Sequence, residues 1–367
     1  MNIHTLVETV QNLPDPRRQY GYFQHKLESI IVIALCATLC GAEDFEDIEQ
    51  FGNARRGWLG KFLDLSNGIP DKDTFRRVLE RLDPAGLAKC LYAWLDQRDC
   101  AGKTVNIDGK TICGSKNAAH TAYHVVTAWV SENHITLGEI AVDGKSNEIT
   151  AIPALLDTLD IEGAVVTADA MACQTGIARK IVEKKAGYCL ALKGNQGSLH
   201  DDVRLYFESI TPPNTFKTLE KDHGRVETRV YALETDIGWL SSKPQWAGLS
   251  GVGAVRSTVR EKGRTRGETR YFITTLTDVA TFASSVRKHW GIENNLHWQL
   301  DVTFGEDAAR QRKDNSPLNW NVLRKTALPL LRNAPIGKNT SVKRKMFMAA
   351  LDVAVLEKIL FRGPEKK

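Results

Sequence analysis

The chain has 367 residues, of which 42% are hydrophobic and 25% charged, and its formal net charge is +5. This length fits two domains, or one large domain with an insertion, and the composition is ordinary for a globular protein. The longest apolar run, residues 30–37, is too short to cross a bilayer. The N-terminus shows no secretory signal pattern, and seven cysteines without a CxxC pair are typical of a reducing compartment. We therefore expect a cytoplasmic protein without a membrane partner.

Charge is distributed unevenly along the chain. Residues 308–367 contain 14 Lys and Arg but 4 Asp and Glu, a net charge of +10, so the remainder carries −5. A basic segment on a mildly acidic body predicts a polyanionic partner, with nucleic acid as the first candidate. A solubilising helical surface explains the same charge equally well.

Residues 1–100 have the periodicity of helices, and we expect them to form a helical domain associated with DNA binding. Helices are predicted over 26–40, after Gly41, and in IPDKDTFRRVLERLDP, residues 69–84. In the last of these, Arg76 and Arg77 lie off the apolar stripe, which makes the helix a candidate for reading a DNA groove. A solvated amphipathic helix explains this pattern too.

The pattern changes after Gly102 to strands that alternate with helices. Three strands come first, the last two as a hairpin, and helices and strands then alternate in the order βββαβα. The predicted strands are 104–107, 123–130, 135–142, 164–168 and 188–192, and the predicted helices are 149–159, 174–185 and 197–207. This order resembles the ribonuclease H-like fold, an α/β architecture with a mixed sheet covered by helices. We assign this core to residues 101–210.

A β-rich insertion is expected over residues 211–278, followed by a C-terminal helical part, 279–367, that carries the basic tail. The insertion reads as two hairpins. The second contains REKGRTRGETR, with five cations in eleven residues, among them Arg264 and Arg266, a density that suits a DNA backbone. His223 and Arg225, in the turn of the first hairpin, are further candidate DNA contacts, with a solvated loop as the alternative.

Two of the predicted strands are each followed by an aspartate, Asp108 in VNIDGK and Asp169 in VVTADAM. If these strands are neighbours in the sheet, both carboxylates emerge at the same edge. Like charges repel unless a cation joins them, and oxygen ligands suit Mg²⁺ or Mn²⁺. Either aspartate alone is equally consistent with a turn residue, but the pair favours a metal site.

A third carboxylate, Glu293, lies on a helix predicted to be largely packed, where it needs a partner. Facing Asp108 and Asp169, it would complete a site for two metals that activate the attacking oxygen and stabilise the leaving oxygen of a phosphodiester. His289, Glu293 and His297 also recur at four-residue spacing on one helix face. A zinc site is the weaker interpretation of this spacing, because no further ligand set accompanies it.

Several other residues are candidates for supporting roles. Lys193, after the strand 188–192, can hold a phosphate beside the carboxylates, and Asn195 can contact sugar or phosphate. The alternatives are an exposed strand-end lysine and a turn asparagine. Glu306 and Asp307 are candidate carboxylates behind the metal ligands, and Trp298 reads as a core residue rather than a base-stacking platform.

Five motifs in order, IDGKT, ADAM, LALKGNQ, HGRVETR and HWGIENNLHWQLDVTFGEDAARQR, resemble the DDE transposases of bacterial insertion sequences, in particular the branch with the H-repeat-associated proteins. The resemblance covers nearly the whole chain. It implies that Asp108, Asp169 and Glu293 hold divalent metals, that a phosphodiester is hydrolysed at the end of the element, and that the freed 3′-hydroxyl attacks target DNA. It also implies DNA as the partner and at least a homodimer on paired ends.

The sequence departs from the family in one respect. Related transposases carry Tyr-x2-Arg-x3-Glu-x6-Lys around the glutamate, whereas the Tyr, Arg and Lys positions here hold Val286, His289 and Leu300. A hairpin-end intermediate that needs those residues loses its support, and His289 or Lys288 becomes a candidate phosphate contact. Two other hypotheses stay open: a ribonuclease H-like nuclease without strand transfer, and an inactive, domesticated DNA-binding relative.

Overall fold

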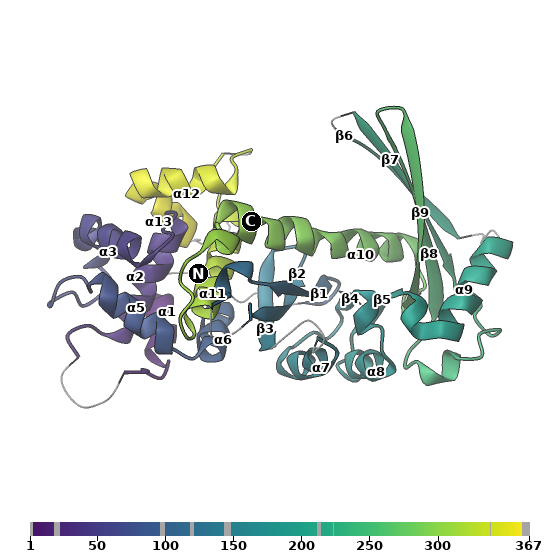
Figure 1. Ribbon diagram of the computed structural model, residues 1–367, viewed down its shortest axis with the longest axis horizontal. Helices are drawn as coiled ribbons and strands as arrows, with labels where there is room; N and C mark the ends of the chain where they lie inside the picture. Colours follow the sequence, from purple (N-terminus) through teal and green to yellow (C-terminus); the bar gives the residue numbers. More distant parts are fainter. Residues whose placement is uncertain are drawn as a thin grey trace.

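The computed structural model describes residues 3–17, 23–95, 100–117, 121–142, 148–210, 214–222, 224–337 and 339–361. Within them, one nine-stranded mixed sheet runs through the molecule in the order β3-β2-β1-β4-β5-β9-β8-β7-β6 (Figure 1). The strands are β1 (Thr104–Thr111), β2 (His124–Val130), β3 (Ile135–Val142), β4 (Val165–Ala168), β5 (Gly187–Leu192), β6 (Thr215–Asp222), β7 (Arg225–Glu234), β8 (Gly251–Glu261) and β9 (Arg264–Thr274).

The strand pairing confirms the predicted hairpins and extends them into one sheet. β2 and β3 form the first hairpin, β1 runs antiparallel to β2, and β1, β4 and β5 are parallel neighbours. The two hairpins predicted between residues 216 and 276 are β6–β7 and β8–β9. They join the core sheet because β9 pairs antiparallel with β5.

The position of Asp108 differs from the prediction, which put it at the end of a four-residue strand. β1 continues to Thr111, so Asp108 lies inside the strand, opposite Thr127 of β2. Pairing with β4 stops at Ile107, but pairing with β2 continues to the last residue of β1. Cross-strand hydrogen bonds from one neighbour therefore keep the backbone extended past the apolar part of the strand.

Helices cover both faces of the sheet. Three lie against one face, namely α7 (Glu148–Thr158), α8 (Thr175–Glu183) and α9 (Gly197–Ser209), and they share a core with Val105, Ile107 and Val166 (Figure 1). The opposite face is crossed by α10 (Val279–Ile292), which contacts β1, β4, β5, β6 and β7. These positions agree with the helices predicted over 149–159, 174–185 and 197–207.

Three of the N-terminal helices lie where the sequence predicts helices, namely α2 (Leu27–Leu39), α3 (Phe45–Ala54) and α5 (Lys72–Arg81). In α3, Asp44 and Asp47 form a capping box, each side chain accepting a backbone N–H near the helix start. In α5, the Asp71 carboxylate accepts the Thr74 N–H at 2.6 Å. Such side-chain caps satisfy backbone donors that the first helical turn leaves unpaired. The N-terminal helices are α1 (Ile3–Gln11), α2 (Leu27–Leu39), α3 (Phe45–Ala54), α4 (Arg56–Leu59), α5 (Lys72–Arg81) and α6 (Pro84–Leu95).

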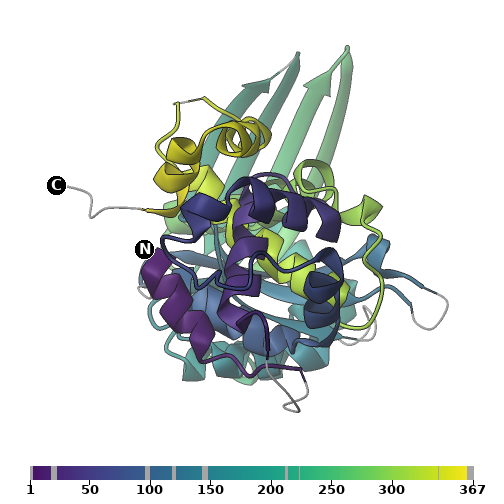
Figure 2. The same ribbon diagram turned by 90° about the vertical axis from the view of Figure 1, so that its left-hand side faces the viewer.

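The two ends of the chain share one hydrophobic core. Figure 2 shows the N-terminal helices interleaved with α11 (Ser316–Asn333), α12 (Val342–Leu351) and α13 (Val353–Leu360). α11 is buried from residue 316 to residue 331 and packs against α2, α5 and α6. None of the described helices combines the length and the apolarity needed to cross a bilayer. The domain boundaries at residues 100, 210 and 278 remain predictions.

Part of the basic C-terminal segment is internal, so neither interpretation of its charge applies to all of its cations. Arg324, Lys325 and Lys345 are 3%, 1% and 5% exposed. Lys325 Nζ lies 2.7 Å from Glu139 Oε2 and 2.8 Å from Thr127 Oγ1. Lys345 Nζ donates to the carbonyls of residues 331, 332 and 334, at the C-terminal end of α11, where a helix leaves carbonyls without helical partners. These cations satisfy internal acceptors and are not available to a polyanion.

We expect Lys325→Met to destabilise the protein by roughly 3–5 kcal/mol, because the buried carboxylate of Glu139 would lose its counter-charge. Equilibrium denaturation with urea measures the loss. Lys343→Met, on the exposed side of α12, is the matched control and should change stability by less than about 0.5 kcal/mol. A loss as small as that of the control would show that the Lys325–Glu139 pair does not hold α11 to the sheet.

Candidate active site

The site begins with the alternation of side chains along β1. Val105 and Ile107 belong to the core under α7 and α8. Successive side chains of a strand point to opposite faces, so Asn106, Asp108 and Lys110 point to the face covered by α10 and α11. Three polar side chains therefore enter a layer between the sheet and the helices, where each needs a partner.

A chain of hydrogen bonds connects Asn106 to the second aspartate. Thr167 Oγ1 donates to Asn106 Oδ1 at 2.7 Å and lies 3.0 Å from Nδ1 of His289 on α10. The other ring nitrogen of His289, Nε2, lies 3.4 Å from Asp169 Oδ1. The imidazole of His289 is thus held by Thr167 on one side and contacts Asp169 on the other. Residues of β1, β4 and α10 together determine the position of this contact.

Asp169 immediately follows β4, as predicted, and contributes to the lining of a cavity of about 130 Å³. Lys193, Arg270, His289 and Trp290 contribute to the lining of this cavity. The hydrogen bond from His289 is the main reason that the pKa of Asp169 is lowered, and the charges of His289, Lys193 and Arg270 act in the same direction. The predicted position of Lys193 beside a site carboxylate agrees with this arrangement.

Asp108 has the opposite electrostatic environment. Burial is the main reason that its pKa is raised to about 7; the charge of His289 and a hydrogen bond from the Gly109 N–H lower it, and the charges of Asp169 and Glu293 raise it further. Its Oδ2 lies 3.5 Å from Nδ1 of His297. Burial and two nearby lysines lower the pKa of His297 to about 3, so this ring is neutral at physiological pH. Asp169 and Glu293 are thus both close enough to act electrostatically on Asp108.

Glu293 is positioned by an irregular stretch of helix. After α10 ends at Ile292, two π-helical turns follow, Glu293–His297 (η6) and Gln299–Thr303 (η7). Leu296 and Leu300 are buried in the core shared with the N-terminal helices, whereas Glu293 itself is exposed. π-Helical turns are rare and occur frequently at functional sites.

Trp298, in the same stretch, is 51% exposed, so the prediction that it is a core residue is wrong. It separates the two π-helical turns, and the buried leucines on either side of it take the inward positions. An aromatic side chain is thereby presented to solvent next to the site.

The donor set fits hard divalent cations, which prefer carboxylate oxygens. The negative charges of Asp169 and Glu293 add to the effect of burial in raising the pKa of Asp108, and a bound cation would relieve this repulsion. Among the described residues, however, no three His, Cys, Asp or Glu side chains are close enough together to hold a metal ion. The carboxylates share a neighbourhood without forming a finished coordination sphere.

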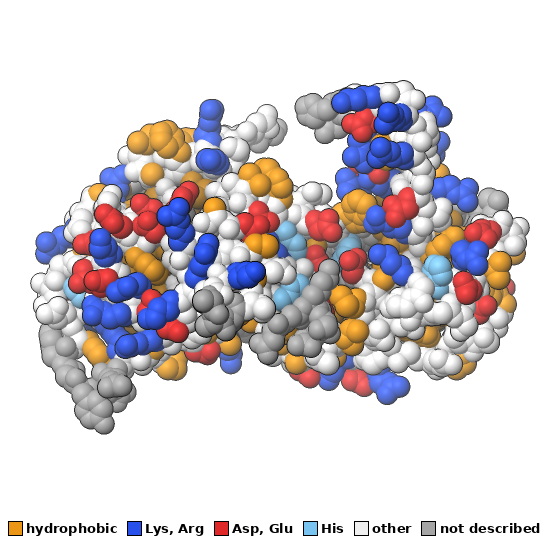
Figure 3. Space-filling model, viewed as in Figure 1, with side chains coloured by type: hydrophobic (Ala, Val, Ile, Leu, Met, Phe, Trp, Pro, Cys, Tyr) orange, Lys and Arg blue, Asp and Glu red, His pale blue; other side chains and the backbone are white. Residues whose placement is uncertain are grey.

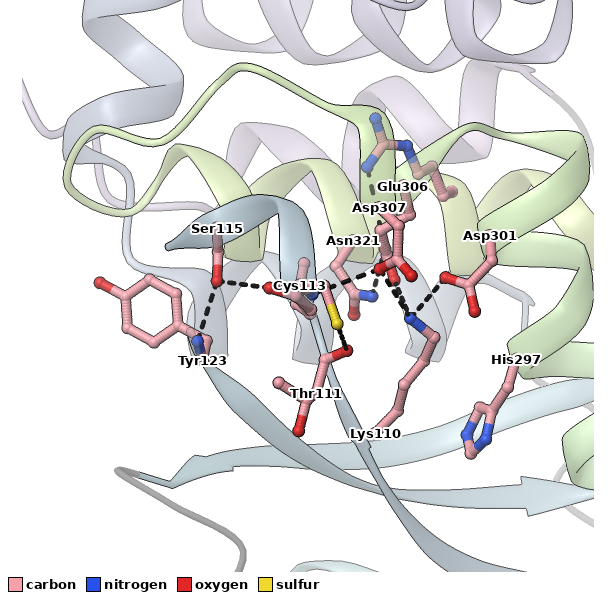
Figure 4. A network of polar contacts seen from close by, with 12 residues as sticks. Lys110, Thr111, Cys113, Ser115, Tyr123, His297, Asp301, Glu306, Asp307 and Asn321 are labelled. Atoms are coloured by element: carbon pink, nitrogen blue, oxygen red, sulfur yellow. Dashed lines mark hydrogen bonds and ion pairs between the residues drawn. The ribbon is translucent and has the colours of Figure 1, made fainter. Parts of the chain in front are cut away.

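Lys110 connects the site to η7 and to the segment that follows it, through ion pairs (Figure 4). Its Nζ lies 2.7 Å from Asp301 Oδ1, 3.0 Å from Glu306 Oε2 and 3.8 Å from Asp307 Oδ1. Burial opposes the charge of Lys110, but these carboxylates outweigh it and raise the pKa of the amine. Glu306 and Asp307 therefore contact Lys110, which lies two residues after Asp108. Their supporting role behind the metal ligands stays a prediction.

Glu306 is fully buried and has three partners. Besides Lys110, Asn321 Nδ2 donates to its Oε1 at 2.7 Å, and Arg324 lies 3.7 Å away, so its pKa is lowered despite burial. Gly114 approaches the backbone of this segment so closely that a Cβ would lie 2.5 Å from the Glu306 carbonyl oxygen. Charge pairing and close backbone packing thus fix the segment to β1 and α11.

The remaining sequence candidates are spread over the molecule. Asn195 donates from Nδ2 to the carbonyl of Ala170 at 2.8 Å, which ties two loops next to Asp169. Arg76 and Arg77 are exposed on α5 and pair with Asp73 and Asp71 of the same helix.

The candidates of the insertion lie away from the carboxylates. Arg225, Arg264 and Arg266 are exposed on the outer part of the β6–β9 hairpins. His223 lies outside the described residues.

Sequence reasoning missed Asn106, Thr167 and Lys325, which position the site from within the fold. The alternation of polar and apolar residues in TVNIDGKT was the available signal, because it marks Asn106 and Lys110 as facing the same side as Asp108. For Thr167 and Lys325 the sequence contained no comparable signal, since their partners are 61 and 186 residues away.

Asp108→Asn should stabilise the metal-free protein, and more so at ~pH 8 than at ~pH 5. The folded protein keeps the Asp108 proton up to about pH 7, whereas an unfolded carboxyl loses it near 3.8, so stability falls as pH rises through this window. We expect the two pH values to differ on the order of 2 kcal/mol in the gain of the variant, measured by denaturation in EDTA. Asp169→Asn is the control, because its lowered pKa predicts no such gain.

Comparisons with known proteins identify the family of the chain. Residues 101–330 match the family model described as "Transposase DDE domain", and residues 7–95 match the one described as "DDE_Tnp_1-associated". YncI of Escherichia coli O157:H7, named as a candidate transposase, is 39% identical over 98% of this chain and 95% of its own length. YhhI of Escherichia coli K12, named as an H repeat-associated candidate transposase, is 35% identical over 98% of both chains. The resemblance seen in the motifs is confirmed, and the chain belongs to the DDE transposase family.

Proposed function

We propose that this chain transposes DNA by cleaving phosphodiester bonds at the ends of an insertion sequence and joining the 3′-hydroxyl ends to target DNA. The observation that carries the proposal is that Asp169 and Glu293 both lie near enough to Asp108 to add to the rise of its pKa, whose main cause is burial. Family membership supports transposition as the overall reaction.

We also infer a ribonuclease H-like core. In support, β1 to β3 are consecutive antiparallel strands, and β4 and β5 add to the other side of β1 in parallel. The first five strands in the sequence therefore lie in the order β3-β2-β1-β4-β5. In such a core, Asp108 lies on the middle strand β1, and Asp169 directly follows its parallel neighbour β4.

Asp108, Asp169 and Glu293 would hold two divalent metal ions, Mg²⁺ or alternatively Mn²⁺. When bound, such ions activate the attacking oxygen and neutralise charge on the leaving oxygen of a phosphodiester. Positioning and charge neutralisation are the main requirements of this chemistry, and both depend on how firmly the carboxylates are held.

The chain's own residues would orient the reacting groups. His289 holds Asp169 through Nε2 and is itself held by Thr167, so the carboxylate keeps one orientation. Lys193 contributes to the lining of the cavity next to Asp169 and can pair with a phosphate as a point charge. The positions that carry Tyr, Arg and Lys in related transposases hold other residues here, so we do not invoke a DNA hairpin intermediate.

Terminal inverted repeats and target DNA are the proposed partners. Two ends must be brought together for an element to move, so we propose a homodimer or higher oligomer on DNA. Action on a bacterial chromosome would place the protein in the cytoplasm.

Asp108→Asn, Asp169→Asn and Glu293→Gln should each lower the cleavage of terminal-repeat DNA by at least about 1,000-fold, because each removes one negative charge from the metal ligands. Binding of the same DNA in EDTA should be unchanged. Glu183→Gln, an exposed carboxylate on α8, is the matched control and should cleave normally. Mg²⁺-dependent nicking that persists in any of the three site variants would contradict the assignment.

Strand transfer distinguishes a transposase from a nuclease. With terminal-repeat DNA that is already cut to expose a 3′-hydroxyl, we expect Mg²⁺-dependent joining to a supercoiled plasmid, detected as labelled plasmid product. A nuclease would release labelled fragments without joined product. A chain that binds the repeats but neither cuts nor joins them would be an inactive relative.

A further inference from the structure

The four strands β6–β9 form a ribbon that rises from the rest of the molecule beyond α9 and α10 (Figures 1 and 2). Lys and Arg side chains gather over its outer part (Figure 3). Because side chains alternate along each strand, the registers determine which cations share a face. The two faces of the ribbon differ sharply in charge.

One face carries four cations in two rows. Across the strands, Lys217 lies opposite Val230, which lies opposite Arg256. Lys221 lies opposite Val226, which lies opposite Arg260. Residues directly opposite in an antiparallel pair point to the same side, so all four cations point to one face, here named the open cationic face.

The open cationic face has no charge compensation in the described strands. Its other positions between the two rows and on the neighbouring part of β9 are threonine, valine, leucine or glycine. Lys217, Lys221, Arg256 and Arg260 are exposed, and no ion pair joins any of them to a described carboxylate. Four like charges that repel one another are therefore left to solvent or to a partner.

The opposite face, which packs on α10, is charge-balanced. Arg229 pairs with Glu220 at 3.0 Å and with Glu227 at 2.6 Å, and Arg270 pairs with Glu268 at 2.9 Å.

Two of the arginines that the sequence suggested as DNA contacts have similar neighbours on that face. Arg225 pairs with Glu227 at 3.0 Å, and Arg264 lies opposite Glu261 in the register. The density of cations in REKGRTRGETR is thus partly neutralised locally.

The spacing of the two rows suits duplex DNA. Four residues separate Arg256 from Arg260, which corresponds to about 13 Å along a strand, and β6 and β8 are about 10 Å apart. The major groove of B-DNA is about 12 Å wide, so the two rows can contact phosphates on its two sides. Backbone contacts of this kind bind DNA without reading its sequence.

We propose that the open cationic face binds the phosphate backbone of duplex DNA, on the side of the ribbon away from α10 and the site carboxylates. The choice of DNA as the polyanion rests on the proposed function. The duplex is either the terminal repeat outside the cleaved end or the target, two sources of the same backbone chemistry.

The test variant is Arg256→Gln/Arg260→Gln, and the control is Arg264→Gln/Arg266→Gln. The control also removes two positive charges, but from the opposite face of the ribbon, on the adjacent strand β9. The dissociation constant of a labelled duplex is measured in EDTA at several KCl concentrations. Each lost phosphate contact reduces the slope of log K against log[salt] by about 0.9, so the first pair should reduce it by about 1.8. The second pair should reduce it clearly less.

Lys217→Gln/Lys221→Gln, on β6, provides an independent test of the same face in case the arginine variant unfolds. Retention of the wild-type slope by both variants, at an unchanged unfolding midpoint, would overturn the proposal. So would a larger slope change in Arg264→Gln/Arg266→Gln. Terminal-repeat and unrelated duplexes of equal length are compared. A slope change with both duplexes, or with one alone, supports the proposal. A change with one alone identifies whether the bound duplex is the terminal repeat or the target. The assay contains no metal, so it fails or succeeds independently of cleavage.

Discussion

The structure depends on the polar face of β1. Asn106, Asp108 and Lys110 enter a layer covered by α10 and α11, where an unpaired polar group costs free energy. Thr167 donates to Asn106, and Lys110 pairs with Asp301 of η7 and with Glu306 after it. Asp108 accepts the N–H of the adjacent Gly109 and lies 3.5 Å from the neutral His297, with Asp169, Glu293 and His289 near enough to affect its pKa. Asp108 is the side chain of this row that is expected to bind a cation.

The site forms where the sheet meets the helical end of the molecule. Leu296 and Leu300 anchor the stretch around Glu293 in a core that includes α2 and α11, so the glutamate is held by helices from both ends of the chain. The buried pair Lys325–Glu139 connects α11 to β3, and the hydrogen bond from Tyr92 to Glu139 connects α6 to the same strand. Residues far from the carboxylates therefore control their spacing, which two-metal chemistry requires to be reproducible.

Strand alternation organises the ribbon as it organises the site. The face on α10 pairs its arginines with glutamates because part of it is covered, and buried charges need counter-charges. Beyond α9 the other face is exposed, so its cations do not need counter-charges. On that part of the face, cations occur without carboxylates. Both faces carry cations, but beyond α9 only one also carries carboxylates, so one surface is used for packing and the other is suited to a polyanion.

The sequence by itself determined the local elements and the identity of the chemistry. Apolar periodicity placed the predicted helices and strands to within a few residues, and the motifs around Asp108, Asp169 and Glu293 identified the family. Only the tertiary structure decided that Asp108 lies within β1, that basic residues such as Lys325 are internal partners, and that the cations of the ribbon divide between two faces. The physical reason is that these features depend on pairing between residues distant in the chain, which local pattern does not contain.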